Sequence, residues 1–175
     1  MYFIANWKMF GSVKSVNSLN KVISYSKTKK LKANIIYCPP YTLIKSFVDK
    51  TKKSNIKIGA QDCHTQINYG PFTGAISSKM IKDLGGKFVI IGHSETRAEN
   101  DNKKINLKIK SALNEKLNVI LCIGERLIDK RKNKTNYVLK KIGISGQKKI
   151  LRSKGSISFQ SDFFDGVLIH MAAAV

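Results

Sequence analysis

Short apolar runs alternate along this chain with longer segments in which apolar residues recur at helical spacing. The apolar runs predict β-strands at 2–6, 33–38, 56–62, 88–91 and 118–123. The segments between them predict helices at 13–25, 41–53, 77–84 and 102–117. A strand-helix unit of roughly 25–30 residues is typical of right-handed βαβ connections in a parallel sheet. Because the strands are almost wholly apolar, we expect the sheet to be covered on both faces.

The stretch F-V-I-I-G-H-S-E-T-R at 88–97 is the clearest of these units. Its four apolar residues predict a buried strand, which Gly92 ends with a tight turn. His93 follows the carboxyl end of this strand, and Ser94 and Glu95 begin the next helix. Active sites of parallel sheets form at this end of the strands, so His93 is a candidate catalytic residue.

Two other strands end in polar residues at the same edge of the predicted sheet. The first strand runs into Asn6 and Lys8, and the fifth runs into C-I-G-E at 122–125. Taken alone, Asn6 also fits a turn cap, and Lys8 also fits a solvated surface lysine. Together with His93 they suit a small anionic substrate with a carbonyl group. The lysine supplies positive charge, and the histidine donates a hydrogen bond to an oxygen that gains charge.

A glycine-rich segment from Thr65 to Ala75 separates the third strand from the next helix. It is longer than a strand-helix connection requires, which predicts a loop that reaches beyond its own unit. Ser77 is placed to cap the helix that follows, and Gly85 is placed to end it.

The chain has 175 residues, 42% of them hydrophobic, which suits one globular domain with a substantial core. No apolar run approaches the length of a membrane span, and the first residues lack the plan of a signal peptide. Cys38, Cys63 and Cys122 lie far apart in the sequence, so neither a zinc site nor a disulfide framework is predicted. We expect a cytoplasmic protein in a reducing compartment.

The formal net charge of +21 raises the hypothesis of a nucleic-acid partner. Only 4 of the 32 basic residues are arginine, and lysine reads bases less well than arginine. Lysine, asparagine and isoleucine all have A/T-rich codons, so we attribute much of the charge to genome base composition. Nucleic acid is therefore not the partner we expect. A non-catalytic lysine-rich protein that binds nucleic acid or acidic surfaces stays as an alternative, with tight, salt-dependent binding as its signature.

The periodic pattern decays after Thr135, although 137–142 predicts the start of a helix, and no period is present from 143 to 161. We therefore divide the chain into βα units one to five at 1–142 and a basic tail at 143–175. Between Lys130 and Lys154 lie ten basic residues and no acidic one, which is typical of a solvated segment. D-G-V-L-I at 165–169 predicts one further buried strand.

Five short motifs occur along the chain in a defined order and spacing. They are A-N-W-K-M at 5–9, G-A-Q-D at 59–62, F-T-G-A-I-S at 72–77, I-G-H-S-E at 91–95 and L-C-I-G-E at 121–125. Over residues 2–138 the chain resembles the triosephosphate isomerase family. The resemblance implies an α/β fold of the parallel (β/α) TIM-barrel type, with about five βα units and a candidate last strand. It also implies interconversion of dihydroxyacetone phosphate and D-glyceraldehyde 3-phosphate through an enediolate, with no cofactor and no metal.

The resemblance implies a role for each matched residue at the strand ends. Lys8 would bind the phosphorylated triose and balance its charge, and Asn6 would orient the substrate. His93 would be the electrophile that polarises the carbonyl and moves a proton between the two oxygens, kept neutral by a helix N-terminus. Glu95 would pair with Lys8 and position it.

The resemblance also implies a homodimer in the cytoplasm, with a role in glycolysis and gluconeogenesis. Thr73, on the Thr65–Ala75 loop, would reach into the partner subunit and support its site. Cys122 would pack near the site and would not act as a nucleophile.

The last third of the chain departs from the family pattern. The family's catalytic base is a glutamate in a sixth-strand motif such as A-Y-E-P-V-W-A, and no glutamate follows Glu125. The Y-G-G-S segment of the seventh loop is missing, and His170 and Met171 stand where two phosphate-binding glycines are expected. Five or six strands cannot close an eight-stranded barrel, so we expect an incomplete barrel with open edges.

Three origins fit this departure: a truncation by internal deletion, a misread frame after about residue 141, and a half-barrel that is completed by association. Three functional interpretations also remain at this point. They are an isomerase, a non-catalytic lysine-rich binding protein, and an inactive remnant.

Overall fold

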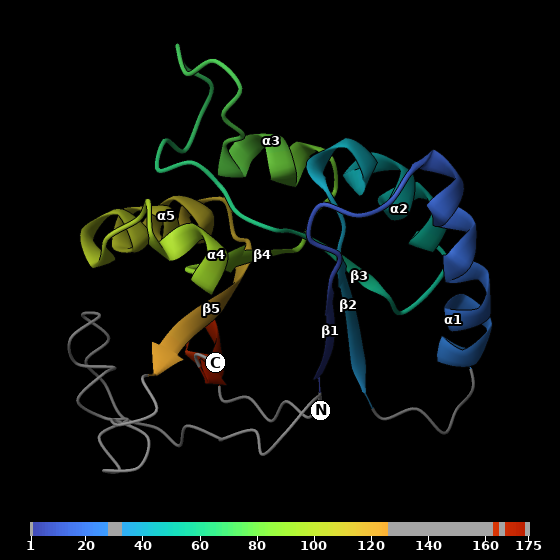
Figure 1. The fold of residues 1–175 in the computed structure, drawn as a ribbon. Coiled ribbons are helices and arrows are strands. Elements are labelled where there is room, and N and C mark those ends of the chain that lie inside the picture. Colours follow the sequence, from blue (N-terminus) through green and yellow to red (C-terminus); the bar gives the residue numbers. More distant parts are fainter. Residues whose placement is uncertain (1, 28–32, 126–162, 165–166, 174–175) are drawn as a thin grey trace.

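The computed structural model describes residues 2–27, 33–125, 163–164 and 167–173, which form a curled sheet with helices along one side (Figure 1). The strands are β1 (Tyr2–Asn6), β2 (Asn34–Cys38), β3 (Lys57–Ala60), β4 (Phe88–Ile91), β5 (Asn118–Glu125), β6 (Phe163–Phe164) and β7 (Val167–Ala173). The helices are α1 (Leu19–Ser26), α2 (Ile44–Thr51), α3 (Ser78–Asp83), α4 (Ser94–Arg97) and α5 (Asn102–Asn114), with 3₁₀ turns η1 (Val13–Ser18) and η2 (Tyr41–Leu43).

The strand order is β1-β2-β3-β4-β5-β7-β6, and the first five strands are parallel in chain order. This arrangement confirms the prediction of an incomplete parallel (β/α) fold of the TIM-barrel type, with five parallel strands and helices between them. Within the described residues, β1 pairs with β2 alone, so the sheet does not close.

Alternate residues of each strand pack on opposite faces of the sheet, as the nearly continuous apolar runs predict. On one face, Val89, Ile91 and Leu121 join the helices in the larger core cluster, which includes Phe47 of α2. The other face forms a smaller cluster of buried residues: Ile36, Cys38, Phe88, Ile90, Ile120 and Cys122. All four residues of β4 are therefore buried.

The first predicted helix, at 13–25, is wrong in its first half, where the structure has the 3₁₀ turn η1. The serines of this segment make local hydrogen bonds instead. The Ser12 amide donates to the Ser15 hydroxyl at 2.9 Å, and the Ser18 hydroxyl donates to the Ser15 carbonyl at 2.7 Å. Such bonds compete with the α-helical pattern, so the regular helix begins only at Leu19.

The cap predictions around α3 are confirmed. The Ser77 hydroxyl accepts a hydrogen bond from the Met80 amide at 3.2 Å. Gly85 follows the helix with φ +93° and donates to the Lys82 carbonyl at 2.9 Å. A left-handed glycine of this kind ends a helix without strain.

The last predicted strand, at 165–169, is confirmed over 167–169 and continues to Ala173 as β7 (Val167–Ala173), while 165–166 lie outside the described residues. It lies parallel to β5 over seven register pairs, one of which joins His170 and Cys122. This pairing also explains why β5 continues to Glu125, two residues beyond the predicted end. The predicted start of a helix at 137–142 and the basic segment 143–161 lie outside the described residues.

The three cysteines are free and buried. None of the helices in the described part of the chain is long and apolar enough to cross a membrane.

The end of α5 gives a stability prediction. Lys116 has φ +56°, and its amide and that of Leu117 donate to the Leu113 and Ala112 carbonyls at 2.9 and 3.0 Å. Lys116→Gly should raise the free energy of unfolding by about 0.5–1 kcal/mol, because glycine adopts this conformation without strain. Lys110→Gly, in the exposed interior of the same helix, should lower it by about 1 kcal/mol. Urea unfolding measures both, and a loss of stability in both variants would contradict this reading.

Candidate active site

The end of β1 is tied to the ends of β2 and β3 by hydrogen bonds. The Lys8 amide donates to Asn6 Oδ1 at 2.9 Å, and the Trp7 amide donates to the Cys38 carbonyl at 3.1 Å. The Gln61 amide nitrogen Nε2 donates to the Lys8 carbonyl at 2.8 Å and to the Cys38 carbonyl at 2.9 Å. The backbone around Lys8 is thus fixed by groups from β1, β2 and the end of β3.

These bonds hold Lys8 in an unusual backbone conformation, with φ +51°. A residue other than glycine pays about 1–3 kcal/mol for such a conformation, which persists only where the surroundings enforce it. Strain of this kind concentrates at functional sites. Among the described lysines only Lys116 shares a positive φ, and Lys116 follows α5, whereas Lys8 lies at the sheet edge.

The side chain of Lys8 reaches across the sheet edge to α4. Its Nζ lies 2.7 Å from Glu95 Oε1, and both side chains are about half exposed. The hydrogen bond from Lys8 holds the pKa of the Glu95 carboxyl below its ordinary value. The structure therefore contains the ion pair that the resemblance implied, and Glu95 is ionised at neutral pH.

His93 follows the turn after β4 and is the N-cap of α4. Its Nδ1 accepts a hydrogen bond from the Glu95 amide at 3.3 Å, and its carbonyl accepts from the Thr96 amide at 2.9 Å. A neutral imidazole that accepts through Nδ1 carries its hydrogen on Nε2. The ring can then donate through Nε2 to a carbonyl oxygen of a substrate.

Sequence reasoning assigned no role to Arg97, which joins the carboxyl ends of two strands. Its guanidinium donates to the Gly92 carbonyl and to the Cys122 carbonyl, both at 3.0 Å, and to Asn102 Oδ1 at 3.1 Å. Gly92 has φ +75°, and a Cβ there would lie 3.1 Å from the Cys122 carbonyl oxygen. The turn that leads to His93 is thus fixed against β5.

Gln61 is the second residue whose role the sequence analysis did not find. It stands in the G-A-Q-D motif at 59–62, so the motif marked its position. The two hydrogen bonds that Gln61 donates to carbonyls at other strand ends have no periodic or compositional signal in the sequence.

Cys122 lies on the inner face of the sheet and is buried. Burial raises the pKa of its thiol to about 12, although the nearby Arg97 opposes the shift. The thiol is therefore protonated at neutral pH, which suits a packing residue and not a nucleophile.

The Thr65–Ala75 loop projects from the body of the molecule between β3 and α3 (Figure 1). Thr73 is exposed on it, and so are the aromatic rings of Tyr69 and Phe72. The Tyr69 hydroxyl donates to Asp83 of α3 at 2.8 Å, and the ring of Phe72 stacks on His64. His64, which matched no site motif, therefore serves to order the loop.

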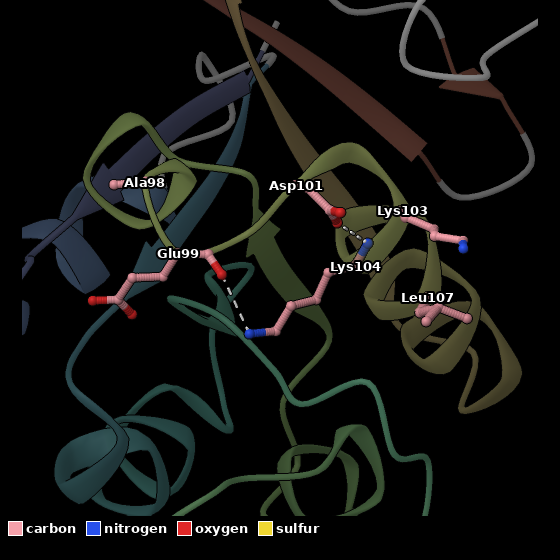
Figure 2. A pocket seen from close by; sticks show the side chains of 6 residues that line it. All are labelled: Ala98, Glu99, Asp101, Lys103, Lys104 and Leu107. Carbon is pink, nitrogen blue, oxygen red and sulfur yellow. Dashed lines mark hydrogen bonds between the residues drawn. The ribbon is translucent and has the colours of Figure 1, made fainter.

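A shallow depression lies over the connection from α4 to α5 (Figure 2). Its lining consists of Ala98, Glu99, Asp101, Lys103, Lys104 and Leu107. Figure 2 shows Lys104 reaching the Glu99 carbonyl, at 3.3 Å, so the lysine has a partner within the chain. The depression contains none of Asn6, Lys8 and His93.

Across the residues that the structure describes, no group of three or more His, Cys, Asp or Glu residues could hold a metal ion. At the sheet edge, the Lys8 ammonium can bind an anion and the His93 ring can donate a hydrogen bond. This is the chemistry of charge balance and carbonyl polarisation.

The Lys8–Glu95 pair gives a titration prediction. Because the pKa of Glu95 is lowered, the pair persists above the ordinary carboxylate range and is lost as the pH falls through the lowered value. Lys8→Met should raise the Glu95 pKa toward its ordinary value, because the hydrogen bond from Lys8 is the largest cause of its lowering, and NMR titration of the carboxyl carbon measures the change. Lys45→Met, which removes the partner of Asp49, should leave it unchanged. An unshifted Glu95 in Lys8→Met would refute the pairing.

Known proteins are similar to this chain in sequence and in fold. The family profile for triosephosphate isomerase matches residues 1–154. Triosephosphate isomerase from Wolbachia sp. subsp. Brugia malayi (strain TRS) is 39% identical over 140 residues, which cover 78% of this chain and 56% of the relative. The enzyme from Taenia solium is 42% identical over 135 residues, which cover 76% of this chain and 53% of the relative.

A solved structure is similar as well. The crystal structure of triosephosphate isomerase from Bartonella henselae matches with a TM-score of 0.71 and 33% identity, and covers 81% of this chain and 59% of that chain. This chain spans about half the length of the curated relatives it matches. The matched profile covers most of the chain, and the motifs at the strand ends lie within it. The chain therefore belongs to the triosephosphate isomerase family.

Proposed function

We propose that this site serves triose-phosphate isomerisation, the interconversion of dihydroxyacetone phosphate and D-glyceraldehyde 3-phosphate through an enediolate. The observation that carries the proposal is the strained Lys8, whose Nζ lies 2.7 Å from Glu95 beside the candidate electrophile His93. Membership of the family supports the same reaction. Neither observation favours the alternative of a non-catalytic lysine-rich binding protein.

Each residue of the site has a part in this reaction. The Lys8 ammonium balances the charge of the phosphorylated triose, and Asn6 orients the substrate while its Oδ1 holds the Lys8 amide. The His93 Nε2–H donates to the substrate carbonyl and stabilises the oxygen that gains charge in the enediolate. His93 then moves a proton between the two substrate oxygens. Glu95 keeps the lysine in place between turnovers.

Removal of the proton from carbon requires a base, and no glutamate follows Glu125 in this chain. A positioned base contributes about 10²–10⁴ to the rate. We therefore propose that this chain binds and polarises the substrate, and that without a positioned base its turnover is slower by about that factor. Proton transfer beside a carbonyl proceeds without redox chemistry, so the proposal includes no cofactor.

We further propose a homodimer that forms through the Thr65–Ala75 loop, with Thr73 supporting the site of the partner. The exposed Tyr69 and Phe72 on that loop support this assembly, because exposed aromatic rings are typical of interfaces. The three free, buried cysteines suit the cytoplasm, where the reaction would serve glycolysis and gluconeogenesis.

Isomerase turnover of the purified chain tests the proposed reaction. We expect slow conversion of D-glyceraldehyde 3-phosphate that disappears in His93→Ala, because the electrophile is then lost. Lys50→Ala is the matched control and should keep the rate, since Lys50 is exposed in the last turn of α2 and belongs neither to the candidate site nor to the Thr65–Ala75 loop. A rate that is the same in His93→Ala and in the unaltered chain would overturn the proposal.

Analytical ultracentrifugation tests the proposed dimer. Phe72→Glu places a charge in the interface and should raise the dissociation constant of the dimer at least tenfold, the ratio that about 1.4 kcal/mol produces. Leu107→Glu is the matched control, because Leu107 is exposed to a similar degree, 49% against 46%, but lies on α5. Equal masses for the two variants would contradict the loop as the interface.

A further inference from the structure

One ion pair in the described part of the chain is buried, unlike the others. Lys108 of α5 places its Nζ 2.5 Å from Asp62 Oδ2, and the two side chains are 7% and 25% exposed. The other Lys–carboxylate pairs among the described residues have side chains that are 35–62% exposed. A buried charge is costly unless it is paired, and such a pair is weak support for stability in itself. This ion pair is therefore better explained by the part of the chain that it holds in place than by the stability that it adds.

Asp62 is fixed from two further sides. The Tyr41 hydroxyl donates to the Asp62 carbonyl at 2.5 Å, and the thiol of the next residue, Cys63, lies 3.7 Å from the Lys108 carbonyl. Lys108 thus binds the carboxylate of Asp62, and Tyr41 donates a hydrogen bond to the backbone carbonyl of the same residue. The segment directly after β3 is anchored to α5 and to η2.

This anchored segment carries the side chain that fixes the backbone of Lys8. Gln61 immediately precedes Asp62, and its Nε2 donates to the Lys8 and Cys38 carbonyls at 2.8 and 2.9 Å. A continuous path of contacts therefore runs from Lys108 through Asp62 and Gln61 to Lys8. The left-handed backbone of Lys8 is strained, so it depends on such support.

We propose that Lys108 and Asp62 are positioning residues, whose ion pair fixes the turn after β3 so that Gln61 keeps Lys8 directed at Glu95. The pair acts through Gln61 and does not itself touch the substrate. The inference deepens the proposed function and relies on it only for the catalytic meaning of Lys8. The contacts that make up the path are independent of any reaction.

The pKa of Glu95 reports on this path, because the hydrogen bond from Lys8 is the largest cause of its lowering. Asp62→Asn is the sharpest single variant. The amide can still accept a hydrogen bond from Lys108, and the loss of a negative charge would by direct electrostatics lower the Glu95 pKa. We expect the opposite, a rise of the Glu95 pKa toward its ordinary value of about 4.3, because Lys8 loses its position.

A double variant, Asp62→Asn with Lys108→Met, removes both charges and leaves no unpaired ion inside the protein. It should raise the Glu95 pKa at least as far as Asp62→Asn does, and Gln61→Met should raise it too. The matched control, Asp83→Asn with Lys79→Met, removes an exposed ion pair and should leave it unchanged. The measurement is an NMR titration of the full chain, with signal dispersion as the check that each variant is folded.

A Glu95 pKa that stays at its original value in folded Asp62→Asn and in Gln61→Met overturns the proposal, and assigns the buried pair to stability alone. A rise in Asp62→Asn and in Gln61→Met supports it, even where the double variant does not fold. The readout needs no turnover. An inactive chain with the expected rise would therefore refute the proposed isomerase and leave the positioning role intact.

Discussion

The side-chain amide of Gln61 donates both of its hydrogens to carbonyl oxygens at the ends of other strands, those of Lys8 and Cys38. The Cys38 carbonyl also accepts from the Trp7 amide, so three strand ends meet at one group. Without these bonds, little would compensate the strain in the backbone of Lys8. The geometry of the candidate active site therefore depends on polar side chains that bond to backbone more than on the apolar core beneath it.

The curled sheet supplies the frame for these bonds. Its two apolar clusters fix the strands from both faces, while the carboxyl ends of β1, β3, β4 and β5 remain free to carry polar residues. Gln61 fixes the loop after β1 by donating to backbone carbonyls. Arg97 fixes the turn after β4 in the same way, by donating to the carbonyls of Gly92 and Cys122. Lys8 and Glu95, which are 87 positions apart in the sequence, thereby come into contact.

The sequence predicted the parts of this structure that depend on apolar periodicity and on caps. It placed β4 at 88–91, the Ser77 cap and the start of α5 at Asn102 correctly, because each has a strong local signal. It missed the 3₁₀ turn at Val13–Ser18, where serine side chains compete with the helix.

The roles of Gln61, Arg97 and the buried Lys108 were also beyond the sequence pattern. Each depends on a partner that only the folded sheet brings near. The left-handed backbone of Lys8 had no signal either, since lysine is not a residue that favours it. The pairing of Lys8 with Glu95 followed from family resemblance, and composition alone would have left Lys8 as one solvated lysine among many.

We propose that Lys8 and His93 together polarise a triose phosphate toward its enediolate. Exchange of solvent deuterium into dihydroxyacetone phosphate, followed by proton NMR, is the sharpest test, because it detects enediolate formation even where net turnover is slow. We expect exchange at C1 that exceeds the buffer rate and that is lost in His93→Ala. Exchange at the buffer rate, or exchange that is equal in the variant, would contradict it.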